Sequence, residues 1–332
     1  MKVLIFSHES DIDGLGNIVL AKLAFKDLDY ILCPGFKELK NKFSECLSND
    51  SLIPYDRIYI TDLALLPPTL TSLKENDTLN KKVLIFDHHT GSLDEGCGKY
   101  EFETITELDE QGNKTCGTKL FYEHLIKEGY LNRTDILDEF VELTRLEDTW
   151  EWKQKGDFGI KAHDLAILFN SINNREEYVS RMITKINNDK TIEFNEEELT
   201  IIQNKKAEYE KVLKDILDTS KILIDENNNK YCAVFAKYEY RNELAEYIAK
   251  IGNPNQVKYL IIIALDKGAY GQKSYRSIIK GTDVNEIAIS HGGGGHPESA
   301  SVIITKSQRE HANTLEKDEA LTYLINSNYI NE

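Results

Sequence analysis

The chain has 332 residues, of which 41% are hydrophobic and 29% are charged, and its formal net charge at pH 7 is −16. This length allows two domains, each with its own core. The lack of any apolar run of about eighteen residues argues against a membrane-spanning helix. The negative charge argues against a passive groove for long duplex nucleic acid, because such grooves need clustered Lys and Arg side chains.

The cysteines and the N-terminus predict a reduced, cytoplasmic protein. Five cysteines are scattered along the chain without a CxxC pair, which does not resemble a disulfide framework. The apolar run Val3–Phe6 is much shorter than the hydrophobic core of a signal peptide. One lobe is mildly basic, because residues 230–306 contain ten basic and seven acidic residues. This lobe could hold a small anion.

The first third of the chain alternates short apolar runs with segments of helical spacing. The predicted strands cover residues 3–6, 30–33, 57–61 and 83–86, and the predicted helices cover 14–26, 38–47 and 67–74. Alternation of this kind indicates an α/β fold with a mainly parallel sheet flanked by helices. Runs such as VLIF, which are apolar at every position, suit strands buried on both faces.

The middle of the chain is predicted to be helical. Thr115 is a candidate N-cap for a helix over 119–127, and Thr134 for one over 136–146. Residues 195–219 form a long charged segment without Gly or Pro, which predicts an extended helix that joins two domains.

The last third predicts a second, smaller α/β domain. Its expected strands cover residues 222–224, 231–235, 259–264, 274–279 and 300–304, and its expected helices cover 242–250 and 284–290. We therefore divide the chain into a first domain over 1–190, a helical linker over 191–220 and a second domain over 221–332.

Side chains that commonly bind metal ions follow three of the predicted strands. The candidate ligands are His8, Asp11 and Asp13 after the first strand, Asp62 after the third, and Asp87, His88 and His89 after the fourth. In open parallel sheets, ligands bind beyond the carboxyl ends of the strands, where the strand order switches. So many acids in one crevice would repel one another unless divalent cations were bound among them. Carboxylate and imidazole ligands favour Mn²⁺ or Mg²⁺ over a cysteine-type structural zinc site.

Each of these motifs has a simpler interpretation when it is taken alone. The segment Asp11–Gly14 could be a turn that caps a helix, and Asp62 could cap the following helix. The adjacent histidines are harder to explain structurally, because imidazoles directly after a buried strand make poor core residues. Recurrence at three strand ends favours a metal site. Asp148, near the end of a predicted helix, is a further candidate ligand.

A glycine run at Gly292–Gly295 is the second notable motif. Glycines let main-chain N–H groups approach a ligand closely, typically an anion. A flexible turn is the alternative interpretation. The flanking histidines and the upstream segment Ser274–Ser277 favour a phosphate or nucleotide clamp, in which Arg276 would supply forked donors.

Together, these motifs resemble the DHH phosphoesterase superfamily. HESDIDG at 8–14, the strand-end Asp62, the DHH triplet at 87–89 and the downstream Asp148 match its four motifs, and SYRS and GGGGHP match the substrate-binding DHHA1 domain. The resemblance spans nearly the whole chain. It implies a DHH catalytic domain over 1–190 and a DHHA1 domain over 221–332.

Within that superfamily the chain is most similar to the nanoRNase branch. The resemblance implies a phosphoric ester hydrolase that degrades very short oligoribonucleotides to mononucleotides, and that also dephosphorylates pAp in some members. Two alternatives stay open. One is a phosphodiesterase for cyclic di-AMP or its linear product pApA, and the other is a non-catalytic nucleotide sensor. The superfamily includes many dimers, so a homodimer is compatible with the resemblance.

The resemblance also implies roles for individual residues and two divalent cations as cofactors, Mn²⁺ first and Mg²⁺ second. His8 and Asp11 would bind one cation, Asp13, His88 and Asp148 the other, and Asp62 both. His89 would face the scissile phosphate, and Asp87 would orient its neighbours. The expected substrate contacts in the second domain are Ser274, Arg276, Gly293, Gly294, Gly295 and His296.

Overall fold

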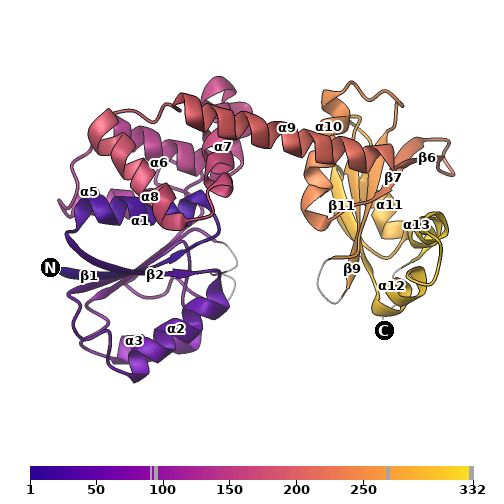
Figure 1. The fold of residues 1–332 in the computed structure, drawn as a ribbon. Helices are drawn as coiled ribbons and strands as arrows, with labels where there is room; N and C mark the ends of the chain where they lie inside the picture. The colour runs from indigo at the N-terminus through magenta and orange to yellow at the C-terminus, as the bar shows by residue number, and fades with distance from the viewer. Residues whose placement is uncertain (90–91, 93–95, 267–269, 329–332) are drawn as a thin grey trace. The chain divides into compact units, whose positions relative to one another are not determined.

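The computed structural model describes residues 1–89, 92, 96–266 and 270–328 (Figure 1). The chain forms two compact units, Met1–Lys205 and Lys206–Glu332. Helix α9 (Glu196–Asp218) continues from the first unit into the second, which confirms the single long helix expected over 195–219. The functional division at 190 and 221 stays a prediction. Among the described residues, no helix is both long and apolar enough to cross a membrane.

Unit 1 is built on a five-stranded parallel sheet in the order β2-β1-β3-β4-β5. Its strands are β1 (Lys2–His8), β2 (Asp27–Cys33), β3 (Arg57–Thr61), β4 (Val83–Asp87) and β5 (Glu103–Ile105). The mainly parallel α/β fold is therefore confirmed. The sequence did not predict β5, because three residues at the sheet edge carry too little apolar pattern to be recognised.

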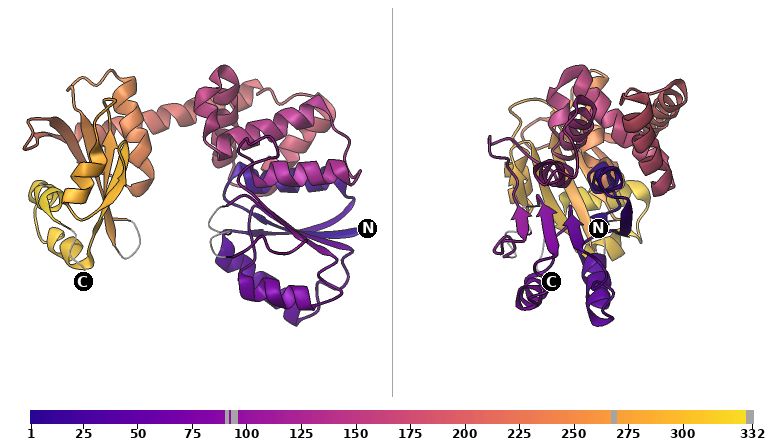
Figure 2. Two further views of the ribbon diagram at one scale, coloured as in Figure 1. Left: turned by 180° about the vertical axis from the view of Figure 1, so that it is seen from behind. Right: turned by 90° about the vertical axis from the view of Figure 1, so that its left-hand side faces the viewer.

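Helices cover both faces of this sheet (Figures 1 and 2). One face carries α1 (Ile12–Ala24), α5 (Gly117–Lys127), α6 (Asp135–Asp148), α7 (Gly156–Ser171) and α8 (Arg175–Thr184), and the other carries α2 (Phe36–Ser48) and α3 (Pro67–Glu75). In β1, Val3 and Ile5 pack into the hydrophobic core on the α1 side of the sheet, whereas Leu4 and Phe6 pack into the core on the α2 side. Burial on both faces explains the uninterrupted apolar run.

Two helix starts in unit 1 test the predicted caps. Thr134 caps α6, since its side chain accepts a hydrogen bond from Leu137 N at 3.4 Å. The predicted cap at Thr115 is wrong. Helix α5 begins at Gly117, and the Asp13 carboxylate accepts from Gly117 N and Thr118 N, both at 2.7 Å. A buried acid from another helix thus occupies the place that a local hydroxyl was expected to fill.

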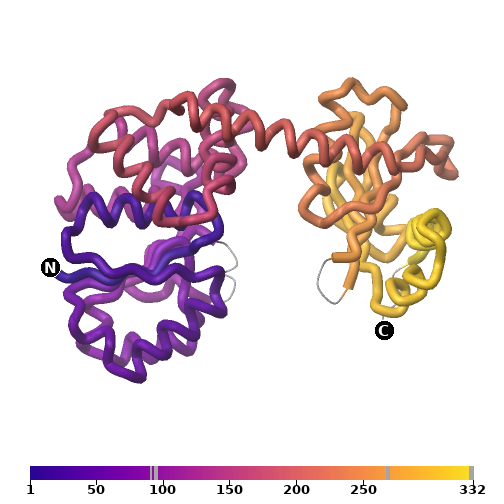
Figure 3. Tube along the Cα trace, viewed as in Figure 1, coloured from indigo at the N-terminus to yellow at the C-terminus, as the bar shows by residue number. Residues whose placement is uncertain are grey.

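Unit 2 contains a mixed six-stranded sheet in the order β10-β11-β9-β8-β7-β6 (Figure 3). Its strands are β6 (Lys221–Ile224), β7 (Lys230–Phe235), β8 (Tyr259–Ala264), β9 (Gly271–Ser277), β10 (Gly294–His296) and β11 (Ser299–Ile304). One face packs against α10 (Arg241–Lys250) and part of α9, and the other against α11 (Val284–Ser290), α12 (Lys306–Ala312) and α13 (Lys317–Asn326). The sequence did not predict β10, α12 or α13.

Candidate metal centre

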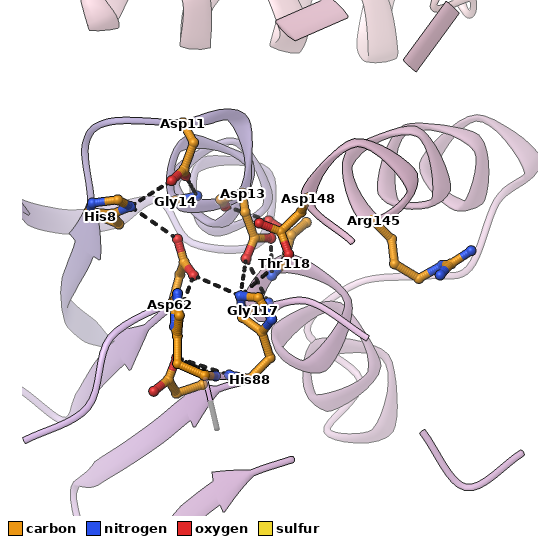
Figure 4. Close-up of polar contacts among 12 residues, drawn as sticks. His8, Asp11, Asp13, Gly14, Asp62, His88, Gly117, Thr118, Arg145 and Asp148 are labelled. Atoms are coloured by element: carbon orange, nitrogen blue, oxygen red, sulfur yellow. Dashed lines mark hydrogen bonds and ion pairs between the residues drawn. The ribbon is translucent and has the colours of Figure 1, made fainter. Parts of the chain in front are cut away.

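The candidate site lies at the carboxyl ends of β1, β3 and β4 (Figure 4). Strand β1 has β2 on one side and β3 on the other, so the strand order switches beside it. Crevices at such switch points bind ligands in open α/β sheets. His8 ends β1, Asp11 caps α1 by accepting from Gly14 N at 2.9 Å, and Asp62 directly follows β3.

Glycines bring the starts of two helices against the acids. An added Cβ would lie 2.0 Å from His8 O at Gly14 and 2.8 Å from Asp62 Cβ at Gly117. No larger residue fits at either position without movement of the backbone. The close approach points the positive N-terminal ends of α1 and α5 towards Asp11 and Asp13. Both helices therefore stabilise negative charge in the crevice.

The first group of potential metal ligands contains His8, Asp11 and Asp62. His8 Nδ1 lies 2.7 Å from Asp11 Oδ2 and 3.5 Å from Asp62 Oδ2. Asp62 is 1% exposed and has a φ of 56°, in the left-handed region. A non-glycine residue in that conformation costs on the order of 1–3 kcal/mol, and such residues are concentrated at functional sites.

The second group contains Asp13, His88 and Asp148. His88 Nε2 lies 3.4 Å from Asp148 Oδ2 and 3.8 Å from Asp13 Oδ2. It also lies 3.3 Å from Asp62 Oδ1. The two oxygens of the Asp62 carboxylate thus face different groups. Asp62 therefore lies between two groups of potential metal ligands. The resemblance implied this position for Asp62, and its role in binding metal stays a prediction.

Three buried polar atoms in this cluster lack a hydrogen-bond partner: Asp62 Oδ2, His88 Nε2 and Asp148 Oδ2. More than about nine in ten buried polar groups in proteins are hydrogen-bonded, so three neighbouring exceptions need an explanation. Hard oxygen donors and imidazole nitrogens that converge without protein partners are the ligand set of a divalent cation. The residues present therefore fit the expected metal.

The electrostatics of the cluster also require positive charge. Burial and the neighbouring Asp13 raise the pKa of Asp62 well above its usual range and that of Asp148 to about 7. The hydrogen bond to Asp11 and the nearby Asp62 carboxylate raise the pKa of His8 to about 10, although burial opposes this. Without a cation, protons must therefore stabilise the crevice at neutral pH, and a bound cation would replace them.

Asp87 holds His89 rather than joining either group. Asp87 Oδ1 lies 2.7 Å from His89 Nδ1, and Asp87 Oδ2 accepts from Ser92 Oγ at 2.7 Å. The hydrogen bond to Asp87 and the charge of that carboxylate raise the pKa of His89, although burial opposes this. The His89 side chain is 44% exposed. Asp87 thus positions an accessible imidazole at the edge of the cluster.

A hollow of about 230 Å³ opens beside the second group. Its lining includes side chains from the ends of β4 and α6 and from the loop before α5: His88, His89, Glu107, Lys114, Thr115, Asp148, Thr149 and Trp150. The hollow therefore gives a ligand of modest size access to the candidate metal ligands.

In unit 2, the strand register places four of the six predicted substrate contacts on one sheet face. Arg276 pairs with Ser299, which pairs with His296, while Ser274 pairs with Ser301, which pairs with Gly294. Residues opposite one another, and residues two apart along a strand, share a face. Ser274, Arg276, Gly294 and His296 are thus neighbours on the face that packs against α10. Arg276 Nε donates to Asn242 Oδ1 at 2.9 Å.

The glycine run contains an edge strand. An added Cβ would lie 2.1 Å from Ser301 O at Gly293 and 2.5 Å from Ser299 O at Gly295. The close packing of β10 on β11 therefore accounts for these two glycines without a ligand. At Gly294, the nearest atom to an added Cβ would be Asn285 Oδ1 at 3.9 Å. This glycine therefore remains available for close approach to a bound group.

The sequence interpretation missed several residues that shape the site. Gly117 and Thr118 bind Asp13, and Ser92 binds Asp87. Trp150, which lines the hollow, also has no role in the sequence interpretation. No local signal marks Ser92 or Gly117, whose partners are distant in the sequence or lie across a turn.

No family model matches the chain. The oligoribonuclease NrnB of Bacillus subtilis (strain 168) is 30% identical to it over 308 residues, a match that covers 91% of this chain and 72% of NrnB. This level of identity over most of both chains establishes common membership of a family.

The fold is shared with a solved DHH domain, and a second solved structure has a slightly lower TM-score. The DHH domain of a protein from a family of ribosomal proteins has a TM-score of 0.50 and 13% identity, covering 99% of this chain and 87% of that one. A pGpG-specific phosphodiesterase, PggH of Vibrio cholerae, has a TM-score of 0.48 and 15% identity, covering 98% and 99%. Because the chain is related to NrnB over most of its length and carries the DHH motifs, it belongs to the DHH family of phosphodiesterases.

Proposed function

We propose that this protein hydrolyses the phosphodiester bonds of very short oligonucleotides to release mononucleotides, with two divalent cations as cofactors. The proposal rests mainly on the buried Asp62 carboxylate, which lies between two groups of potential metal ligands. It rests also on the atoms of Asp62, His88 and Asp148 that lack hydrogen-bond partners. The relationship to an oligoribonuclease supports the substrate class. The small hollow and the net charge of −16 are consistent with a short substrate rather than a long duplex.

The protein's own residues would divide the binding of the cations. His8 and Asp11 would hold one, Asp13, His88 and Asp148 the other, and Asp62 would contact both. Two divalent cations, when bound, supply an activated water and neutralise the charge of the phosphoryl oxygens. Backbone N–H groups at the N-terminal ends of α1 and α5 would hold the carboxylates of Asp11 and Asp13 in position, since both accept hydrogen bonds there.

His89 would act on the substrate rather than on the metal. Asp87 occupies its Nδ1 at 2.7 Å and favours the protonated imidazole. Nε2–H is then free to donate a hydrogen bond to a phosphoryl oxygen or a proton to the leaving oxygen. Arg276, with Ser274 and His296 on the same face of unit 2, is proposed to bind the nucleotide. Arg276 would contact substrate without contacting the reacting atoms.

A substrate panel tests this proposal directly. Purified protein with Mn²⁺ is assayed on RNA and DNA dimers to pentamers, pAp, pApA, cyclic di-AMP and pyrophosphate, and the Asp62→Asn variant serves as the inactive control. We expect the highest kcat/KM on the dimers to pentamers, and no activity after chelation of the metal. Exclusive activity on cyclic di-AMP or pApA would replace the proposal with that alternative. Tight nucleotide binding without turnover would indicate a sensor.

A further inference from the structure

Trp150 is an exposed aromatic residue beside the candidate metal centre. Its side chain lines the same hollow as His88, His89 and Asp148. It is 55% exposed and belongs to none of the hydrophobic cores. The packing of the fold therefore does not account for a large aromatic residue at this position.

The backbone of Trp150 also disfavours its side chain. The residue lies two positions after the end of α6, with φ 62° and ψ 11° in the left-handed region. Glycine or asparagine usually occupies this position after a helix, because they tolerate positive φ. A bulky residue there is a conformational outlier. The indole is thus held at the mouth of the site despite an unfavourable local conformation.

The neighbouring Trp152 provides a contrast within the same turn. Its ring stacks on His163 with centroids 4.1 Å apart and an interplanar angle of 9°, and its exposure is intermediate. Trp152 therefore has an aromatic partner inside the protein. Trp150 has only the Lys153 ammonium, 4.9 Å from its ring centroid, among the ring contacts found in the described chain. An exposed cation–π contact of this kind is weak, and the Trp150 side chain stays accessible at 55% exposure.

We propose that Trp150 stacks on a nucleobase of the substrate, next to the phosphate held at the metal centre. This inference rests on the proposed function and names a specificity-determining contact for it. Aromatic side chains bind single-stranded nucleotides by stacking, and such contacts tolerate any base because every base has a π-face. The contact would select substrates with a base beside the scissile phosphate over pyrophosphate or base-free esters.

Kinetics with matched substrates test the contact. Trp150→Ala and Trp150→Gly should raise KM for an RNA dinucleotide by roughly 5-fold to 100-fold, with kcat changed less than KM. Trp150→Phe should retain most of the affinity, because it keeps a ring. On a dinucleotide with abasic riboses, all three variants should match the wild type. Phe158→Ala, which removes an exposed aromatic side chain of α7, is the control and should change neither substrate's kinetics.

Fluorescence provides a readout that does not depend on turnover. The chain has two tryptophans, so Trp152→Phe leaves Trp150 as the sole tryptophan reporter. With Mg²⁺ present, a dinucleotide with a non-hydrolysable phosphonate linkage should quench its emission with saturation, and the abasic analogue should not. Trp150→Gly should keep the melting temperature of the wild type, because glycine accepts the left-handed backbone. This separates a lost contact from a lost fold.

The outcomes distinguish the two proposals. If the wild type cleaves dinucleotides but Trp150→Ala has an unchanged KM and no quenching occurs, the stacking inference is wrong and the proposed function stands. If the wild type cleaves no dinucleotide, the proposed function fails and the stacking contact fails with it. A KM increase that is equally large on the abasic substrate would also overturn the inference, because the base would then not be what Trp150 contacts.

Discussion

The candidate metal centre of unit 1 and the predicted substrate contacts of unit 2 differ in how far the protein itself satisfies their polar groups. In unit 1, ionisable atoms of Asp62, His88 and Asp148 converge in a buried crevice without hydrogen-bond partners. In unit 2, Arg276 donates to Asn242 and to the Tyr275 carbonyl. Ser274 Oγ is buried without a partner, but a neutral hydroxyl costs far less to bury than a charge. The charges of the first site therefore need compensation by protons or a bound cation, whereas Arg276 in the second already has hydrogen-bond acceptors within the protein.

The largest expected effect is the loss of turnover on substitution of Asp62. Asp62→Ala or Asp62→Asn should lower kcat/KM by at least about 1,000-fold, because the carboxylate would contact both cations. Calorimetric titration with Mn²⁺ should show weakened binding at both sites. Asp77→Asn, an exposed aspartate in the same unit, is the matched control. Retention of tight binding of two Mn²⁺ ions by Asp62→Asn would contradict the shared role.

A second comparison separates two acids of the same ligand group in metal-free protein. Asp13 accepts hydrogen bonds from two backbone N–H groups of α5. In Asp13→Asn, the amide NH₂ would face one of these N–H groups, so the variant should be less stable by about 1–3 kcal/mol. Asp148 Oδ2 has no hydrogen-bond partner, although His88 Nε2 lies 3.4 Å away. Asp148→Asn therefore removes an unfavourable buried charge. It should stabilise the chelated protein by about 1–3 kcal/mol at pH 8. Urea unfolding after chelation measures both changes.

The stability gained from metal should grow with pH. Burial and the neighbouring Asp13 raise the pKa of Asp148 to about 7, above the value of about 3.9 expected in the unfolded chain. The stability linked to the protonated carboxyl is therefore present below about pH 4 and is lost as pH rises towards 7. The melting-temperature gain with Mn²⁺ should be at least about 5 °C larger at pH 8 than at pH 5. An equal gain at both values would argue against binding at this cluster.

The smallest expected effect concerns unit 2. Arg276→Ala should raise KM by roughly 10-fold and leave kcat within about 2-fold, because Arg276 would contact the substrate and not the reacting atoms. Metal binding should be unchanged. Arg241→Ala removes a neighbouring arginine that covers the Tyr238 ring at 3.9 Å and serves as the control. A fall in kcat with unchanged KM would reverse the roles assigned to Arg276 and Asp62.

The sequence predicted β1, β3 and β4 well because each is a short, mainly apolar run, but it predicted only the second half of β2, whose first half contains Asp27 and Asp29. The expected strand at 57–61 matches β3, and the expected helix at 284–290 matches α11. It did not predict β10, because three residues with two glycines carry no strand propensity, and pairing with β11 decides that conformation. The cap of α5 was misassigned for a related reason. Its partner, Asp13, lies more than a hundred residues away in the sequence.

By itself, the sequence determined which residue types follow each buried strand, because apolar periodicity and the chemistry of Asp and His are local properties. Only the tertiary structure decided which of those side chains meet. The strand order brings Asp62 between His8 and His88, and glycines let two helix ends approach the acids. It also decided that Asp13 serves a helix as well as the candidate metal site, and that Trp150 lines the hollow beside it. Contacts between distant segments follow from how the chain packs, which no local pattern encodes.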